Sequence, residues 1–175
     1  MLTFVVILVV ALIAALLFFA NSQSDRFHIH RYTLISAPPE KIFPLVNDFH
    51  QWKGWSPWEN VEGDELQRRY SGAEAGEGAI YEWEGKKTGV GRMEIMRSQA
   101  PGELNINLDF TKPMKAQNNV EFMLEPDGDK TRADWSMRGE HNFIGKLMSM
   151  FMSMDKMVGR DFERGLAQLK KKAEA

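Results

Sequence analysis

The chain has 175 residues, of which 26% are charged, and its formal net charge at pH 7 is −2. This balance, without a basic stripe interleaved with aromatic residues, lacks the electrostatic signature of a nucleic-acid-binding protein. The sequence contains no cysteine, which excludes disulfides and thiolate metal sites. A chain of this length predicts one domain, or one domain with an appendage.

The appendage is an apolar segment at the N-terminus. Residues 2–20 (LTFVVILVVALIAALLFFA) contain one polar side chain, Thr3, and no charge. As an α-helix, a segment of this length spans about 28 Å, close to the thickness of the hydrocarbon core of a bilayer. We therefore predict one transmembrane helix over residues 1–20, a linker over residues 21–25 and a folded domain over residues 26–175.

A cleaved signal peptide is the alternative interpretation of this segment. It would need a basic region before the apolar run, a shorter run and small residues before the cleavage site. No Lys or Arg precedes the run, and Phe18 and Phe19 stand where a small residue is needed. These features favour an uncleaved, single-pass anchor, and the signal peptide stays the alternative.

The position of the domain relative to the membrane follows from the residues after the anchor. The polar linker Asn21–Asp25 reaches about 17 Å when fully extended, so we expect the domain to lie beside the bilayer. Arg26 and Arg31 follow the anchor, and the positive-inside tendency then favours the cytoplasmic face for the domain.

The domain opens with a strand and a short helix. The segment Phe27–Ser36 is rich in aromatic and β-branched residues, which is typical of a strand. Pro39 suits the first turn of a helix, and apolar residues then recur at three- and four-residue spacing. The sequence therefore predicts a short amphipathic helix over about Pro39–Asp48.

Three tryptophans follow this helix at a spacing of three: Trp52, Trp55 and Trp58. This spacing places them along one side of a helical or 3₁₀ turn. They can fill the core, form an aromatic wall of a ligand pocket, or face the headgroup layer of a membrane, which tryptophan favours.

Successive strands are predicted from Leu66 to Glu140. The clearest alternation of apolar and polar residues runs from Leu104 to Phe110, and similar alternations follow around Phe122 and Trp135. The connections are short and rich in glycine and aspartate. This pattern predicts about six strands in an antiparallel meander with one buried face.

The last predicted element is a long helix. An apolar stripe at three- and four-residue spacing begins at Phe143 and ends at Leu169. Gly159 and Gly165 each destabilise a helix by about 1 kcal/mol, so we expect them to permit close packing. Methionines are frequent from Met148 to Met157, and these adaptable side chains suit either a core or a pocket for varied apolar ligands.

Several motifs resemble those of a known family: Ala37–Phe43 (APPEKIF), Val46–Phe49 (VNDF), Trp55–Trp58 (WSPW), Gly76–Ala79 (GEGA) and Met157–Leu166 (MVGRDFERGL). The sequence is similar to the START-like SRPBCC proteins, often labelled polyketide cyclase/dehydrase and lipid transport proteins, over roughly residues 27–172. The resemblance implies an α+β helix-grip fold. In this fold a curved antiparallel sheet wraps around a long C-terminal helix, with a hydrophobic pocket between them.

No catalytic constellation is evident in the sequence. A nucleophile elbow, a His-Glu-x-x-His motif and a phosphate-binding loop are all missing. His28 and His30 lie on one face of a strand, where a surface role is expected rather than metal binding. The available carboxylates are Asp48, Glu59, Glu82, Glu84, Asp109 and Asp134. Those that alternate with apolar residues on strands are expected to face solvent. No catalytic residue, metal or cofactor is predicted.

The sequence favours a binding function because small-molecule sites are concave and mostly apolar. We expect the pocket to be lined by Trp55, Trp83, Phe110, Trp135, Met137, Met148, Phe151 and Met152. The predicted function is membrane-tethered binding or transport of a lipid or another hydrophobic small molecule. One alternative is a cyclase/dehydratase-like or hydrolytic enzyme, which would need a buried polar cluster in the pocket. The other is an interaction or stress-response module with a filled core.

Overall fold

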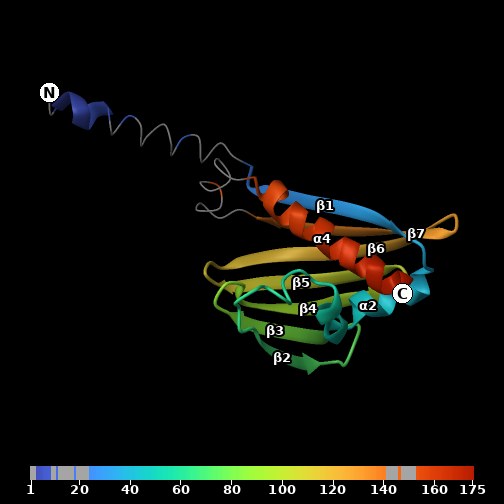
Figure 1. The fold of residues 1–175 in the computed structure, drawn as a ribbon. Helices are drawn as coiled ribbons and strands as arrows, with labels where there is room; N and C mark the ends of the chain where they lie inside the picture. The colour runs from blue at the N-terminus through green and yellow to red at the C-terminus, as the bar shows by residue number, and fades with distance from the viewer. Residues whose placement is uncertain (1–2, 9–10, 12–17, 19–23, 141–145, 147–152) are drawn as a thin grey trace.

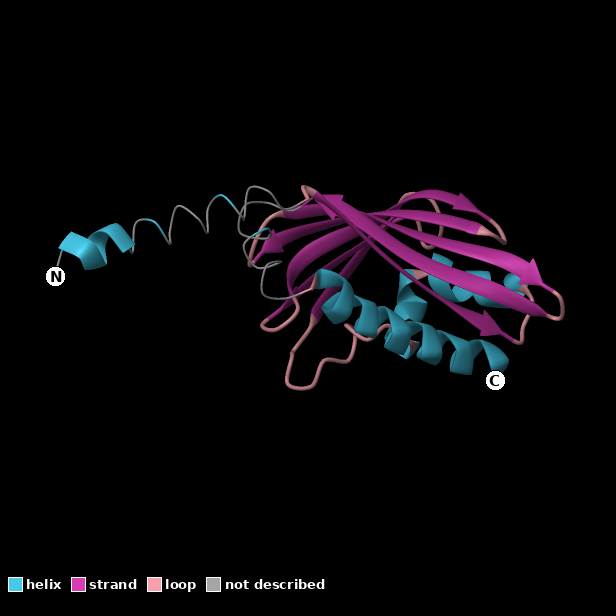
Figure 2. Cartoon of the chain, turned by 90° about the horizontal axis from the view of Figure 1, so that it is seen from above, coloured by secondary structure: helices cyan, strands magenta, loops and turns pink. Residues whose placement is uncertain are grey.

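The computed structural model describes residues 3–8, 11, 18, 24–140, 146 and 153–175. Its elements after residue 25 are β1 (Arg26–Ile35), α2 (Pro39–Asn47), the 3₁₀ helix η1 (Phe49–Gly54), β2 (Gln67–Gly72), β3 (Ala79–Gly85), β4 (Gly89–Gln99), β5 (Glu103–Lys112), β6 (Ala116–Asp127), β7 (Lys130–Glu140) and α4 (Met154–Glu174). The seven strands form one antiparallel sheet in the order β1-β7-β6-β5-β4-β3-β2. The helices lie on its concave face (Figures 1 and 2). This arrangement fits the predicted α+β helix-grip fold.

The core lies between the concave face of the sheet and the helices. On β5 the predicted alternation is observed, because Leu104 and Ile106 are fully buried while Asn105 between them is not. Ile106 pairs with Ile95 of β4 and with Val120 of β6, both of which are buried. The apolar residues of neighbouring strands therefore share one face, which is the face that α2 and α4 cover.

The helix α4 begins later than the sequence predicts. Ser153 has extended backbone (ψ 116°), and its hydroxyl accepts a hydrogen bond from the backbone N–H of Lys156 at 3.3 Å. A serine in this position is a typical N-cap, so the helix starts at Met154. The prediction of one continuous helix from Phe143 is therefore wrong at Ser153.

The two glycines of α4 have the close-packing role that was expected. A Cβ atom on Gly165 would lie 2.6 Å from Cζ3 of Trp135 and 3.1 Å from Cδ of Pro57. At Gly159 the guanidinium of Arg31 occupies the space that a side chain would need. Glycine thus lets α4 approach the sheet at two points along its length.

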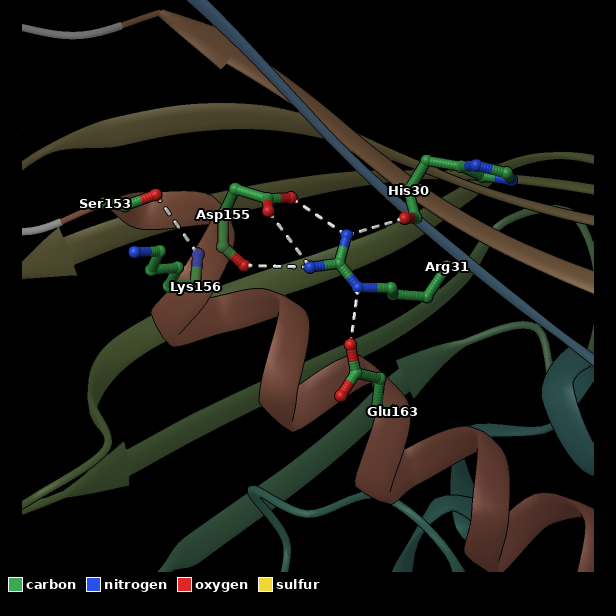
Figure 3. A network of polar contacts seen from close by, with 6 residues as sticks. All are labelled: His30, Arg31, Ser153, Asp155, Lys156 and Glu163. Atoms are coloured by element: carbon green, nitrogen blue, oxygen red, sulfur yellow. Dashed lines mark hydrogen bonds and ion pairs between the residues drawn. The ribbon is translucent and has the colours of Figure 1, made fainter.

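Arg31 on β1 holds the N-terminal half of α4 (Figure 3). Its Nη1 and Nη2 donate to the carboxylate of Asp155 at 2.9 and 3.0 Å, and its Nε donates to Glu163 at 2.7 Å. The hydrogen bond and charge of Arg31 lower the pKa of Asp155 below its usual value. The guanidinium of Arg31 therefore connects two separate turns of α4 to β1, the edge strand of the sheet.

Among the described residues, no helix is long and apolar enough to cross a membrane. Most of the predicted anchor, residues 1–20, and residues 21–23 of the predicted linker lie outside the described part of the chain. The anchor, the linker, the domain boundary at residue 26 and the cytoplasmic orientation stay predictions.

Replacing Gly165 by alanine tests whether packing or helix propensity dominates at this position. Propensity alone would stabilise the helix by about 1 kcal/mol. Overpacking against Trp135 and Pro57 costs about 1–3 kcal/mol, so we expect Gly165→Ala to lower the free energy of unfolding. Denaturant titration of the full-length chain measures the change. Gln168→Ala, at an exposed position of the same helix, should change stability little; a stabilised Gly165→Ala variant would contradict the packing role.

Removing Arg31 should loosen one half of α4 and leave the other half unchanged. Because its partners Asp155 and Glu163 are more than half exposed, the ion pairs together contribute about 1–2 kcal/mol. In Arg31→Gln we expect faster amide hydrogen exchange over Met154–Arg160, with protection retained at the C-terminal end. Arg164→Gln breaks the exposed pair with Asp161 on the same helix and serves as the control. Equal amide exchange over Met154–Arg160 in the two variants would contradict the role of Arg31 in holding this half of α4.

Candidate functional site

A cavity of about 470 Å³ lies between the concave face of the sheet and the N-terminal half of α4. Most of the lining is apolar and includes both aromatic side chains and methionines. The main apolar lining residues are Trp58, Trp83, Phe110, Trp135, Met93, Leu108, Val120, Met137, Met154, Met157, Val158 and Phe162. The volume falls within the usual range for small-molecule sites, about 300–1,000 Å³.

Four of the eight predicted pocket residues line this cavity. They are Trp83 of β3, Phe110 of β5, and Trp135 and Met137 of β7. Three others, Met148, Phe151 and Met152, lie outside the described residues. Contact of any of these residues with a ligand stays a prediction.

The eighth predicted residue, Trp55, does not line the cavity. Its side chain is 2% exposed, and its Nε1 donates to the carbonyl oxygen of Leu45 at 2.9 Å. Trp55 follows the last residue of η1, Gly54, and this hydrogen bond directs its ring into the core. Trp52 and Trp58, which share its spacing, do line the cavity.

The position of Trp83 depends on a glycine on the neighbouring strand. Trp83 of β3 is the register partner of Gly91 of β4, and its ring lies where a side chain on Gly91 would stand. The register of β4 with β5 shifts between Val90 and Gly91, which is a β-bulge. Bulges bend a strand and increase its twist, so the sheet curves where Trp83 forms part of the cavity wall.

A polar cluster is buried in the cavity wall. Glu59 is 6% exposed, and its Oε2 accepts a hydrogen bond from Nε of Arg68 at 2.7 Å. Its Oε1 accepts from the hydroxyl of Tyr81 at 2.5 Å. Burial, together with the hydrogen bond to Glu59, raises the pKa of Tyr81, so the phenol stays protonated at neutral pH. Glu59 and Tyr81 both line the cavity.

The polar groups of the cluster are hydrogen-bonded to one another. A general acid or base needs a proton or lone pair within reach of the substrate. Both carboxylate oxygens of Glu59 already accept hydrogen bonds, and the proton of Tyr81 is directed to Glu59. Among the described lining residues there is no histidine or aspartate. The arrangement neutralises a buried charge and supports the wall.

No pattern in the sequence indicates this cluster. Glu59 lies in a loop, where no periodicity indicates which residues are buried. In the structure Arg68 and Tyr70 alternate on β2 with exposed residues, and their own side chains are only partly exposed. An arginine on the inner face of a strand requires a buried acidic partner.

The histidines singled out in the sequence lie on the opposite, convex face of the sheet. His30 Nε2 lies 2.7 Å from Oδ1 of Asp134, and Nε of Arg132 donates to Oδ2 at 2.8 Å. Burial alone would raise the pKa of Asp134, but the hydrogen bonds from Arg132 and His30 outweigh it and lower the pKa. His28 is exposed beside His30, and no group of three potential metal ligands occurs among the described residues.

The sequence from residue 26 to residue 174 matches a family described as "Polyketide cyclase / dehydrase and lipid transport". The chain belongs to this family. The match confirms the resemblance drawn from the motifs. No curated protein matches the sequence.

Solved structures share the fold at low sequence identity. Protein CV1439 from Chromobacterium violaceum is 15% identical, with a TM-score of 0.61, over 86% of this chain and 98% of that chain. Protein MLL2253 from Mesorhizobium loti is 16% identical, with a TM-score of 0.59, over 83% and 98%. DynU16, a protein of the dynemicin biosynthetic locus, is 12% identical, with a TM-score of 0.59, over 87% and 48%. At these identities the likeness concerns the fold alone.

Breaking the buried cluster should cost far more stability than breaking an exposed pair nearby. Glu59→Gln places an amide donor against Arg68, and breaking a buried pair in this way costs about 3–5 kcal/mol. Glu82→Gln breaks the pair with Arg69, whose side chain is 75% exposed, and should cost less than about 1 kcal/mol. Denaturant titration of both variants compares the two losses. Similar small losses would show that Glu59 is not held as a buried charge.

Proposed function

We propose that the protein binds a lipid or another hydrophobic small molecule in the cavity between the sheet and α4, and that residues 1–20 hold it at a membrane. The observation that carries the proposal is the cavity itself, about 470 Å³ with a mainly apolar lining. Hydrophobic burial in such a cavity stabilises an apolar ligand by about 25 cal/mol for each Å² removed from water. The family description, which names lipid transport, supports this class of ligand.

The lining suits ligands of varied shape. Met93, Met137, Met154 and Met157 approach the cavity from two strands and from α4. Methionine has three rotatable bonds and a polarisable sulfur, so it adapts to irregular apolar surfaces. The methionines can therefore adjust the shape of a lining that also contains rigid aromatic rings.

A cyclase/dehydratase-like activity is the second candidate, and one observation favours it. Glu59 and Tyr81 are polar groups in the wall of an apolar cavity, and the family description includes cyclases and dehydrases. The proton of Tyr81 is directed to Glu59, and each carboxylate oxygen of Glu59 already accepts one hydrogen bond. This engagement supports binding over catalysis.

Filling the cavity should abolish lipid binding. We expect Met93→Trp, which places a larger ring in the cavity, to reduce cross-linking of a diazirine-bearing long-chain lipid to the domain by at least about tenfold, because the ring occupies the ligand's volume. The assay uses the full-length chain in membranes, with cross-linked peptides identified by mass spectrometry. In the wild-type chain, the cross-links should map to the concave face of the sheet.

The matched control is Met96→Trp, on the same strand but 53% exposed and outside the cavity lining. It should cross-link like the wild type, and thermal melts should show that both variants are folded. Cross-links confined to residues 2–20, or equal labelling of the two variants, would contradict binding in the cavity.

A further inference from the structure

The cavity reaches the end of the sheet at which the chain enters from the N-terminal segment. Arg26 at the start of β1 pairs with Glu140 at the end of β7. Because the strands are antiparallel throughout, the β5–β6 hairpin (Lys112–Ala116) and the β3–β4 hairpin (Gly85–Gly89) close at this same end. Both hairpins, the start of β1 and the start of α4 lie on one side of the molecule (Figure 1).

Residues at this end both line the cavity and contact solvent. Lys87, Pro113 and Glu140 are exposed and belong to the lining, and Met157 is 45% exposed. The cavity therefore has its mouth here, between the two hairpins and the first turns of α4. At the other end of the sheet, α2 and the C-terminal half of α4 close the core.

The tip of the β5–β6 hairpin combines positive charge with apolar side chains. Lys112 and Lys115 are exposed, no ion pair involves either of them in the described part of the chain, and the tip contains no acidic residue. Pro113 and Met114 lie between the two lysines and line the mouth. Cations that flank apolar residues match the boundary between anionic headgroups and acyl chains.

The other hairpin at the mouth carries less net charge. Lys86 and Lys87 lie at its tip, but Asp64 accepts hydrogen bonds from the backbone N–H groups of both, at 2.6 and 3.1 Å. Desolvation raises the pKa of Asp64, but hydrogen bonds from Thr88 and from the backbone of both lysines outweigh it and hold the pKa at about 2, so the carboxylate stays charged at physiological pH. The β5–β6 tip is therefore the stronger candidate for contact with anions.

We infer that the β5–β6 tip docks on anionic phospholipid headgroups and so turns the mouth of the cavity toward the bilayer. This inference rests on the proposed function, including the predicted anchor. Neighbouring strands lie about 4.8 Å apart, so β5 is about 15 Å from β1 across the sheet, a distance comparable to the roughly 17 Å reach of the predicted linker. A hydrophobic ligand can then pass between bilayer and cavity without crossing water.

The absence of cysteine from the sequence allows a direct test with single labels. Met114→Cys carries an environment-sensitive NBD fluorophore at the tip, and Asp129→Cys carries it in the β6–β7 turn at the opposite end of the sheet. The full-length chain is placed in nanodiscs that contain phosphatidylserine and a headgroup-level spin-labelled quencher. We expect quenching of the label at position 114, none at position 129, and much less at 114 in pure phosphatidylcholine.

Charge-removing substitutions show which lysines hold the β5–β6 tip on anionic headgroups. Each lysine near an anionic surface contributes about a fivefold preference, so Lys112→Gln combined with Lys115→Gln should shift the docking equilibrium by about 30-fold. Lys41→Gln combined with Lys130→Gln removes the same charge at the other end and should have little effect. In the wild-type chain, salt at about 1 M, where the Debye length is about 3 Å, should weaken docking as the Lys112 and Lys115 substitutions do.

Three outcomes would overturn the inference. They are equal quenching at positions 114 and 129, equal quenching in neutral and anionic discs, and shielding of the tip that depends on protein concentration, which would indicate a second copy of the chain. The lipid cross-linking assay separates the two proposals. Cross-links in the cavity without docking would leave the proposed function standing, and docking without such cross-links would leave only the membrane contact.

Discussion

The parallel stack of Trp135 on Phe162 determines how the sheet and α4 meet. Their ring centroids lie 4.0 Å apart with planes inclined by 7°, and Trp135 also stacks on Phe122 of β6 at 5.0 Å. On the C-terminal side of the stack, Leu169 is fully buried, whereas on the N-terminal side Met157 is 45% exposed. The same helix therefore closes the core on one side of the stack and forms a cavity wall on the other.

The two halves of α4 are held by different forces. Burial of an apolar side chain such as Leu169 contributes about 1.5–3 kcal/mol, and the C-terminal half depends on such contacts. The N-terminal half depends on Arg31, whose carboxylate partners are largely exposed, and such pairs contribute little in water. The helix is consequently held most weakly where it borders the cavity, which is the half that a ligand must contact.

The parts of the structure that follow from local patterns could be predicted, and those that depend on one hydrogen bond or one loop could not. The alternation from Leu104 to Phe110 fixes which face of β5 is buried, because side chains on a strand alternate strictly. An apolar stripe shows the face of a helix but not its first residue, so the N-cap at Ser153 was missed. The burial of Trp55 and of Glu59 follows from no such pattern, because it is set by hydrogen-bond partners elsewhere in the chain, Leu45 and Tyr81.

The polar groups of the cavity limit how a ligand can lie in it. Within the wall, Arg68 neutralises Glu59, so no net charge faces the interior, and a charged ligand group there would lose its hydration without gaining a partner, at a cost of several kcal/mol. At the mouth, Lys87 and Glu140 are exposed to solvent and can accompany a polar group. An amphipathic molecule therefore has one favourable orientation, with its apolar part inside and its head at the mouth. A lipid leaving a bilayer tail-first into this cavity would keep its headgroup in contact with water throughout.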